Sequence, residues 1–410
     1  MIPFNVDITY RQMGLQLSDQ VILRWLASLV LMYISFVVGI IISRPFFGKR
    51  KLSRKEFKQD LLKLATKKRK DVRDIFPFFA IFVAIFTFWL LWRPDFIDYF
   101  LTGDITAETY KAARVSFGAN ANNGVLLRIA STFRFTALPL CLYILFFIRK
   151  INTKYTPLFW AIFCITFLLN LISGQKGGVI LILLGLFLCW LFSTGHITIS
   201  LTTKVGKRFI GIALLLIFIL LPFQYMVQYP GITYQEGLMA VANRLSGEVS
   251  RTLQLHFHVY PDIFPHLNGA SSSFTNIFTD NDVVLDPGRV IRGYFLFSDI
   301  TDATGTWNAA FIGAAWADFS YFGVVLQSIL IVSLLSYYHQ WFIGSHKTPS
   351  VLGTYIALSM STFFLSEGNF LTTLFSFGLG LNFIFYLMLR RFSSLKKNKK
   401  KIPKSLKPSI

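Results

Sequence analysis

Acidic side chains are scarce in this 410-residue chain, which has 20 aspartates and glutamates against 41 lysines and arginines. Cysteine is scarcer still, with only Cys141, Cys164 and Cys189, each inside a strongly apolar stretch. A thiol in such surroundings behaves as a small hydrophobic side chain, so the sequence excludes a framework of disulfide bonds.

Motifs for metals and nucleotides are lacking as well. His256 and His258 have no further ligands at a suitable spacing, and Asp280, Asp282 and Asp286 lack the glycine and the final glutamate of a calcium loop. The chain has no glycine-rich nucleotide-binding motif on the side where its basic residues gather. We therefore expect no metal and no cofactor, and a chemistry that uses neither ATP nor a sugar nucleotide.

Apolar residues, by contrast, are abundant: 54% of the chain is hydrophobic, 17% is aromatic and 44 residues are phenylalanine. A soluble domain cannot bury that much apolar surface, whereas a membrane span needs about 17–25 mostly apolar residues. The sequence therefore predicts an all-α polytopic integral membrane protein with about 9–11 transmembrane helices. The stretches that qualify are 21–43, 75–93, 129–148, 156–172, 179–193, 209–229, 319–343, 350–366 and 371–389.

The basic residues fall mainly in alternate loops. Loops 44–74, 149–155, 194–208, 344–349 and 390–410 hold 29 of the 41 basic residues in 80 positions, whereas the opposite loops hold nine in 145. Because cytoplasmic loops of membrane proteins carry an excess of lysine and arginine, we predict an outer N-terminus and a cytoplasmic C-terminus. The same distribution explains the net charge of +21 by contact with membrane lipids, without a nucleic-acid partner.

Four parts follow from this topology. Residues 1–229 contain the first six spans and a basic cytoplasmic loop at 44–74, and residues 230–308 form one large outer loop. Residues 309–389 contain the C-terminal spans, and 390–410 are a basic cytoplasmic tail whose final part, 396–410, we expect to be disordered. The outer loop has no lysine, four arginines and eight carboxylates, and its length predicts helices of its own.

The turn SGQKGG, residues 173–178, interrupts two apolar runs and places Lys176 on the outer face, where basic residues are scarce. Glycines let the backbone turn sharply and leave N–H groups accessible, as in small anion-binding sites. Lys176 is therefore a candidate contact for an anionic ligand. The alternative is a lysine that only extends to the lipid headgroups.

A second group of candidates lies in the outer loop. Arg244, Glu248, Arg251 and His258 are spaced so that on one helix they share a face. Guanidinium groups match phosphate oxygens in pairs and tolerate desolvation better than ammonium groups, which favours a site for phosphate. The alternative is a helix face that neutralises its own charge.

Five further residues are candidates because of their position. Arg128 and Arg134 open the third span, and an ionisable residue inside a span points to function unless it reaches the headgroups. Arg289 and Arg292 are either further phosphate contacts or ordinary solvated residues. Asp318 lies near the membrane boundary, where we expect either a site residue or an ion pair with an arginine. The small residues before Asp318 also predict a broken or re-entrant segment.

Together these features resemble the Wzy-type O-antigen and capsular repeat-unit polymerases, which belong with the O-antigen ligases among membrane glycosyltransferases of the GT-C type. The features are the turn SGQKGG, the arginine-bearing outer loop, and NAAFIGAAWADFSYFG at 308–323, which enters a late span. The layout covers most of the chain. The family often has an arginine where this turn has Lys176, and often has glycine where Ser320 follows Asp318 and Phe319 here.

The resemblance implies an enzyme of the bacterial inner membrane with a GT-C-like fold and a periplasmic active face. Such an enzyme moves a growing glycan from undecaprenyl pyrophosphate onto the next lipid-linked oligosaccharide, with a chain-length regulator and a flippase as further partners. The cationic candidates would hold the pyrophosphate, and Glu248 or His258 would accept the proton of the acceptor hydroxyl. Two alternatives stay open: a ligase that attaches O-antigen to lipid A core, and a lipid-linked oligosaccharide flippase or transporter.

Overall fold

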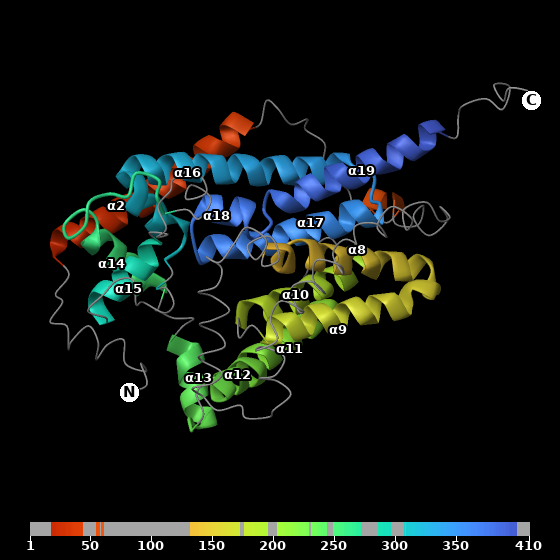
Figure 1. Cartoon of the computed structure of the whole chain (residues 1–410), viewed down its shortest axis with the longest axis horizontal. Coiled ribbons are helices and arrows are strands. Elements are labelled where there is room, and N and C mark those ends of the chain that lie inside the picture. The colour runs from red at the N-terminus through yellow and green to blue at the C-terminus, as the bar shows by residue number, and fades with distance from the viewer. Residues whose placement is uncertain are drawn as a thin grey trace, which may run out of the picture.

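The computed structural model describes residues 18–43, 55–57, 59–60, 132–172, 176–195, 203–228, 231–243, 249–271, 286–296, 307 and 309–399. Helices are the only regular structure in these ranges (Figure 1). The predicted span 75–93 lies outside them. The helices are α2 (Asp19–Ser43), α8 (Ala137–Ile151), α9 (Thr156–Ile172), α10 (Lys176–Ser193), α11 (Lys204–Leu215), α12 (Leu221–Gln228), α13 (Tyr234–Asn243), α14 (Val249–Val259), α15 (Pro287–Leu296), α16 (Phe311–Gly344), α17 (Pro349–Ser361), α18 (Phe370–Phe375) and α19 (Leu381–Lys399), with short turns η3 (Thr153–Tyr155), η4 (Leu216–Leu220) and η7 (Thr362–Ser366).

Three helices of the described chain are long and apolar enough to cross a membrane. They are Asp19–Ser43, Thr132–Ile151 and Phe311–Gly344, and two shorter apolar helices cover Thr153–Leu168 and Gly178–Ser193. The prediction of an all-α chain is thus confirmed for the described residues, and several of its helices suit a bilayer. The count of 9–11 spans stays a prediction.

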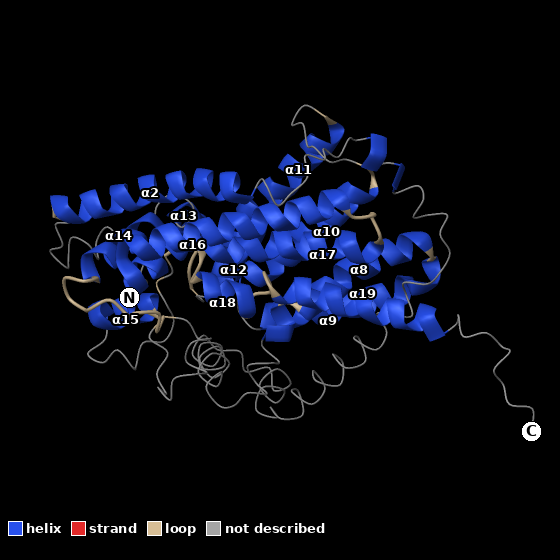
Figure 2. Cartoon of the chain, turned by 90° about the horizontal axis from the view of Figure 1, so that it is seen from above, coloured by secondary structure: helices blue, strands red, loops and turns tan. Residues whose placement is uncertain are grey.

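The long helices run roughly along the longest axis of the molecule (Figures 1 and 2). Only η3 separates α8 from α9, and only three residues separate α9 from α10, so both pairs return directly on themselves. Helices α14 and α15 lie at one end of the bundle, which we call the loop end. The basic residues Arg149, Lys150 and Lys347 lie where α8 and α16 finish, at the opposite end.

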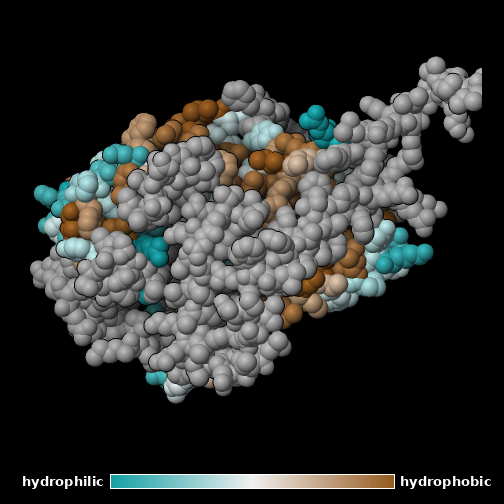
Figure 3. Space-filling model, in the orientation of Figure 1, coloured by the Kyte–Doolittle hydropathy of each residue, from teal (hydrophilic) through white to brown (hydrophobic). Residues whose placement is uncertain are grey.

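Helix α2 packs along α16 through a row of small residues. Its buried face includes Ser28, Ser35, Gly39 and Ser43, and a Cβ atom on Gly39 would lie 3.2 Å from the backbone oxygen of Ile329. Small residues at this spacing let two helix backbones approach closely, which is how helices associate in lipid. The opposite face of α2 exposes large apolar side chains, and Figure 3 shows hydrophobic side chains at the surface of one face of the molecule.

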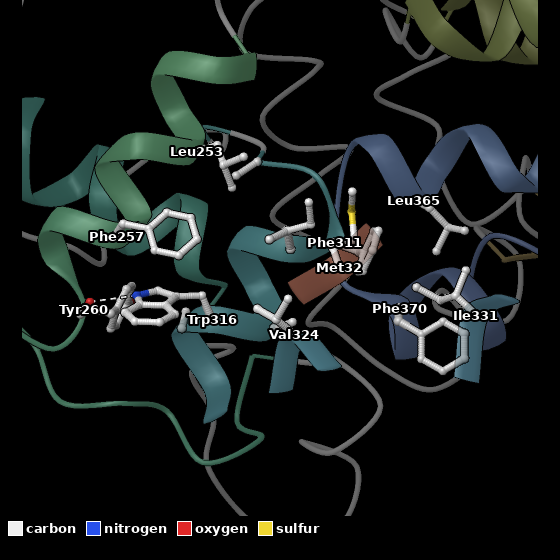
Figure 4. Close-up of a cluster of buried hydrophobic side chains, with 14 of the residues drawn as sticks. Met32, Leu253, Phe257, Tyr260, Phe311, Trp316, Val324, Ile331, Leu365 and Phe370 are labelled. Carbon is white, nitrogen blue, oxygen red and sulfur yellow. Dashed lines mark hydrogen bonds between the residues drawn. The ribbon is translucent and has the colours of Figure 1, made fainter. Parts of the chain in front are cut away.

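The core at the loop end joins α14 to the beginning of α16. Phe257 packs on the Trp316 ring with 4.7 Å between ring centroids, and the Trp316 indole donates a 2.8 Å hydrogen bond to the Tyr260 carbonyl oxygen (Figure 4). All three side chains are at most 2% exposed. Within residues 230–308 the structure has helices α13, α14 and α15, and this core fixes α14 against α16; that the segment is an outer loop stays a prediction.

Two details of the predicted C-terminal part were wrong. The stretch 371–389 is not one helix, because α18 ends at Phe375 and α19 begins at Leu381. Gly378 lies between them with φ +91°, a conformation that glycine adopts without strain. The stretch 396–410 is not disordered from its first residue, since α19 continues to Lys399.

Candidate functional site

A small cavity of about 20 Å³, walled mainly by apolar surface with a few polar side chains, lies inside the bundle, between the beginning of α8, the turn that joins α9 to α10, and helices α17 and α19. Its volume is close to that of one water-sized group. Polar atoms reach it from four segments that are far apart in the sequence. Its walls are formed by Arg134, Phe135, Pro139, Tyr143, Asn170, Gly178, Leu181, Ile182, Ala357, Met360, Ser361, Phe364 and Asn382.

Arg134 supplies the positive charge of the cavity. It lies in the helical turn that precedes α8, only 6% of it is exposed, and its guanidinium carbon is 4.2 Å from the centroid of the Phe135 ring. Arg134 is therefore covered by the protein itself, and its role at the site stays a prediction. Burying a guanidinium group away from water costs free energy. Ionisable residues inside a membrane span are therefore rare and are typical of functional sites.

The turn SGQKGG reaches the same cavity through Gly178. A Cβ atom on Gly178 would overlap the side-chain oxygen of Asn170, whose amide donates a 2.8 Å hydrogen bond to the Thr166 carbonyl oxygen. The two ends of the turn are thus packed together. The predicted turn was too long at one end, because α10 already begins at Lys176. Glycines are tolerated in this first helical turn, where N–H groups have no intrahelical partner. The side chain of Lys176 lies outside the described part of the structure.

Three cavity residues were missed from the sequence: Asn170, Ser361 and Asn382. They are 1%, 2% and 1% exposed. Their signal was available, because an amide within an apolar run such as FLLNLI or LNFIFY needs a hydrogen-bond partner inside the bundle. The amide nitrogen of Asn382 donates to the Ser361 hydroxyl at 3.3 Å, which joins α19 to α17.

A second polar site lies at a break in α16, directly after Asp318. Phe319 has φ −139° and ψ 23°, and Ser320 has φ 56° and ψ −145°, so the helix is interrupted at this pair. A Cβ atom on Gly323 would overlap the Ala315 carbonyl oxygen, although residues eight apart in a straight helix are separated by about 12 Å. The bend is therefore sharp, and the prediction of a broken segment is confirmed.

Asp318 is buried and held by neutral donors. Its carboxylate accepts hydrogen bonds from the Ser271 hydroxyl at 2.5 Å, from the Ser271 backbone N–H at 3.2 Å and from the Asn369 amide at 3.3 Å, and the Gly269 backbone N–H also contributes. The expected ion pair with an arginine was wrong for the described residues, because these four donors already satisfy the carboxylate. Asp318 therefore ties three segments together.

The loop after α14 also closes the exposed end of the broken helix. The N–H groups of Leu267 and Asn268 donate to the carbonyl oxygens of Ala317 and Asp318, at 2.9 and 3.0 Å. Without these two bonds, the carbonyl groups at the interrupted end of the helix would have no hydrogen-bond partner. Burial, together with the nearby Asp286 and Asp318 carboxylates, raises the pKa of the Tyr260 phenol in the same region.

The arginines of the outer loop form a separate group. Arg251 and His258 are seven residues apart on α14 and partly buried, and Arg289 and Arg292 are partly buried on α15, which packs against α14. None of these four residues lines the cavity. Asp286 begins α15 by accepting hydrogen bonds from two backbone N–H groups of the first helical turn, at 2.9 Å from Gly288 and 3.2 Å from Arg289.

Three candidates, Arg128, Arg244 and Glu248, lie outside the described residues. Helix α13 ends at Asn243 and α14 begins at Val249, so the predicted common face of Arg244, Glu248, Arg251 and His258 stays a prediction.

His256 is buried in α14 against Gly313 of α16. Its ring nitrogen Nδ1 lies 2.7 Å from the Thr252 carbonyl oxygen, and burial lowers the pKa of the imidazole to about 4. The ring is therefore neutral at pH 7 and serves packing. Within the ranges that the structure describes, no three histidine, cysteine, aspartate or glutamate residues come together as a metal site would require.

The cavity and the Asp318 site are joined by one short segment. Phe364 in η7 lines the cavity, and Asn369, just before α18, binds Asp318. Five residues of chain span at most about 18 Å, so the two sites are neighbours in space. Their common segment, 364–369, connects the buried arginine with the break in α16.

No protein-family model matches the chain, and no curated protein or solved structure matches it either.

Proposed function

We propose that this protein is a membrane glycosyltransferase that polymerises undecaprenyl-pyrophosphate-linked oligosaccharide repeat units at the periplasmic face of the bacterial inner membrane. The observation that supports the proposal most is the cavity in which the buried Arg134 meets Gly178 of the turn SGQKGG. These residues are far apart in the sequence, and both were expected to approach a phosphate-bearing lipid. A desolvated guanidinium beside a glycine turn suits an anionic ligand.

In this reaction a hydroxyl oxygen of the acceptor sugar attacks the anomeric carbon of the donor glycan. The bond from that carbon to the pyrophosphate oxygen breaks, and undecaprenyl pyrophosphate leaves with the bonding electrons. Negative charge develops on the leaving group, and Arg134 and Lys176 would stabilise it. Preorganised charges of this kind are often the largest contribution to catalysis. No nucleotide and no metal is needed for this step.

The proton of the acceptor hydroxyl requires a base. Glu248 is the first candidate because two arginines flank it in the sequence, and His258 is the second. His258 lies partly buried near the end of α14, at the loop end where acceptor and donor would meet. A well-placed base contributes roughly 10²–10⁴-fold to the rate. Arg251, Arg289 and Arg292 would hold further phosphate oxygens of the two lipid-linked substrates.

The direct test is purified protein in lipid nanodiscs mixed with undecaprenyl-pyrophosphate-linked repeat units, with products separated by size. We expect a ladder of glycans that increase by one repeat unit. Arg134→Gln should abolish the ladder, whereas Arg390→Gln, which removes an exposed arginine of α19, should leave it unchanged. Absence of any ladder from well-folded wild-type protein would reject the polymerase.

A deletion strain separates the polymerase from the ligase and the flippase. Loss of a polymerase leaves a single repeat unit on lipopolysaccharide, whereas loss of a ligase leaves bare core.

A further inference from the structure

The side-chain oxygen of Asn382 is the starting point. Asn382 is 1% exposed, it lines the cavity, and this oxygen has no hydrogen-bond partner among the described residues. A buried acceptor without a partner costs about 1–3 kcal/mol, so such a group usually meets a water molecule or a ligand.

The orientation of the Asn382 amide follows from its neighbour. The single hydroxyl hydrogen of Ser361 is donated to the Ala357 carbonyl oxygen at 3.0 Å. The Ser361 oxygen can therefore only accept, and it accepts from the Asn382 amide nitrogen at 3.3 Å. If the amide were turned over, two oxygens would face each other. The side-chain oxygen of Asn382 is thus turned away from Ser361.

The walls of the cavity define the chemistry of its occupant. Asn382 offers an acceptor, and the Arg134 guanidinium carries N–H donors on a rigid plane. An occupant must donate to one and accept from the other, which a hydroxyl group does. A fully ionised phosphate oxygen has no hydrogen to donate and would be repelled by the Asn382 oxygen. With about 20 Å³, the cavity takes one hydroxyl-sized group and not a sugar ring.

Two of the residues that line the cavity, Phe135 and Phe364, pack together with Phe377. Phe364 stacks on Phe377 with 4.3 Å between ring centroids, and both rings meet the edge of Phe135 at 5.8 and 5.4 Å. The Arg134 guanidinium lies on Phe135, and its several N–H donors would serve a hydroxyl group in the cavity as well as a phosphate beside it.

We propose that this cavity is a subsite for one hydroxyl group of the sugar that adjoins the pyrophosphate, with Asn382 as a specificity-determining acceptor and Arg134 as the donor. This inference rests on the proposed function, because it names the part of the substrate that the site reads. A site that bonds a substrate hydroxyl discriminates strongly against the deoxy analogue, since its buried polar groups are then left without partners.

The test uses purified protein in nanodiscs and a panel of methyl glycosides of glucose, galactose, mannose and their N-acetylamino derivatives, with binding measured by saturation-transfer NMR. We expect at least one glycoside to bind, and one of its single-deoxy derivatives to bind at least about tenfold more weakly. Asn382→Leu should weaken the parent glycoside equally and leave the deoxy derivative unchanged. Gln327→Leu removes another buried amide, on α16 outside the cavity, and should change neither.

Asn382→Ser serves as the second variant because its hydroxyl keeps an acceptor oxygen and still has a hydrogen to donate to the Ser361 oxygen. It should retain discrimination between parent and deoxy glycoside even if Asn382→Leu does not fold. The inference is overturned if the wild type binds parent and deoxy sugars equally, or if it binds no member of the panel. The cavity would then hold a water molecule and no sugar hydroxyl group. A normal ladder without discrimination rejects only this subsite, whereas discrimination without a ladder rejects only the polymerase.

Discussion

The hydroxyl group of Ser271 donates a 2.5 Å hydrogen bond to the carboxylate of Asp318, and this bond joins the loop after α14 to the break in α16. Asn369 adds a third segment through its amide, which bonds both Ser271 and Asp318. Charged hydrogen bonds at a buried carboxylate are worth about twice as much as neutral ones. The outer loop is therefore fixed to the helix bundle at one buried anion.

Replacing Asp318 by asparagine should destabilise the protein by about 3 kcal/mol. The asparagine NH₂ group would face N–H and O–H groups that donate to the carboxylate in the wild type, so hydrogen would meet hydrogen. The measurement is thermal unfolding of purified protein, which should show a lower melting temperature for Asp318→Asn and for Ser271→Ala. Ser359→Ala is the control, since the Ser359 hydroxyl bonds only the Tyr355 carbonyl oxygen of its own helix. Unchanged melting of Asp318→Asn would show that the anion holds nothing together.

Gly323→Ala should destabilise the sharp bend of α16 by about 1–3 kcal/mol, since the added Cβ atom would overlap the Ala315 backbone oxygen, which cannot move like a flexible side chain. Gly344→Ala is a matched control at the other end of the same helix, where a Cβ atom meets nothing within 4 Å. We expect the control to be neutral or slightly stabilising. Equal melting temperatures for both variants would argue against the bend.

Gly178→Ala should remove the ladder of polymerised glycans at normal protein abundance. The added Cβ atom would displace the Asn170 amide, which lines the cavity beside Arg134. Gly211→Ala, in the middle of α11, has open space around it and should polymerise as the wild type does. A normal ladder from Gly178→Ala would mean that the turn and the cavity take no part in the reaction.

The stability of the protein should fall as the pH drops from about 6.5 to about 4. The pKa of His256 is lowered from 6.5 to about 4 in the folded state, so the unfolded chain takes up a proton first. Stability is therefore complete above pH 6.5 and lost below it, by about 3 kcal/mol in all.

Chemical unfolding followed between pH 4 and pH 7 measures this loss. His256→Leu should flatten the pH dependence, whereas His346→Gln, at an exposed position, should retain it. If His256→Leu kept the full slope, other groups would account for it.

Local sequence patterns were enough to predict most of the helices and the interruption of α16 before residue 320. Long apolar stretches produce helices wherever they occur, because the backbone groups of an apolar segment must be satisfied within it. The small residues before Asp318 indicated a break, and glycines beside Lys176 indicated a turn. The same hydropathy pattern could not reveal the turn between α18 and α19, since an apolar window is insensitive to the φ +91° of Gly378.

Partners across the bundle were decided only by tertiary structure. An ion pair with an arginine was one of two alternatives for Asp318, and among the described residues it instead meets Ser271 and Asn369, which no local pattern connects to it. Asn170, Ser361 and Asn382 each look like an isolated polar residue in an apolar run, and only the packing of α9, α17 and α19 brings them to Arg134. Periodicity fixes which face of a helix a residue occupies, whereas the neighbour that this face meets depends on how separate helices cross.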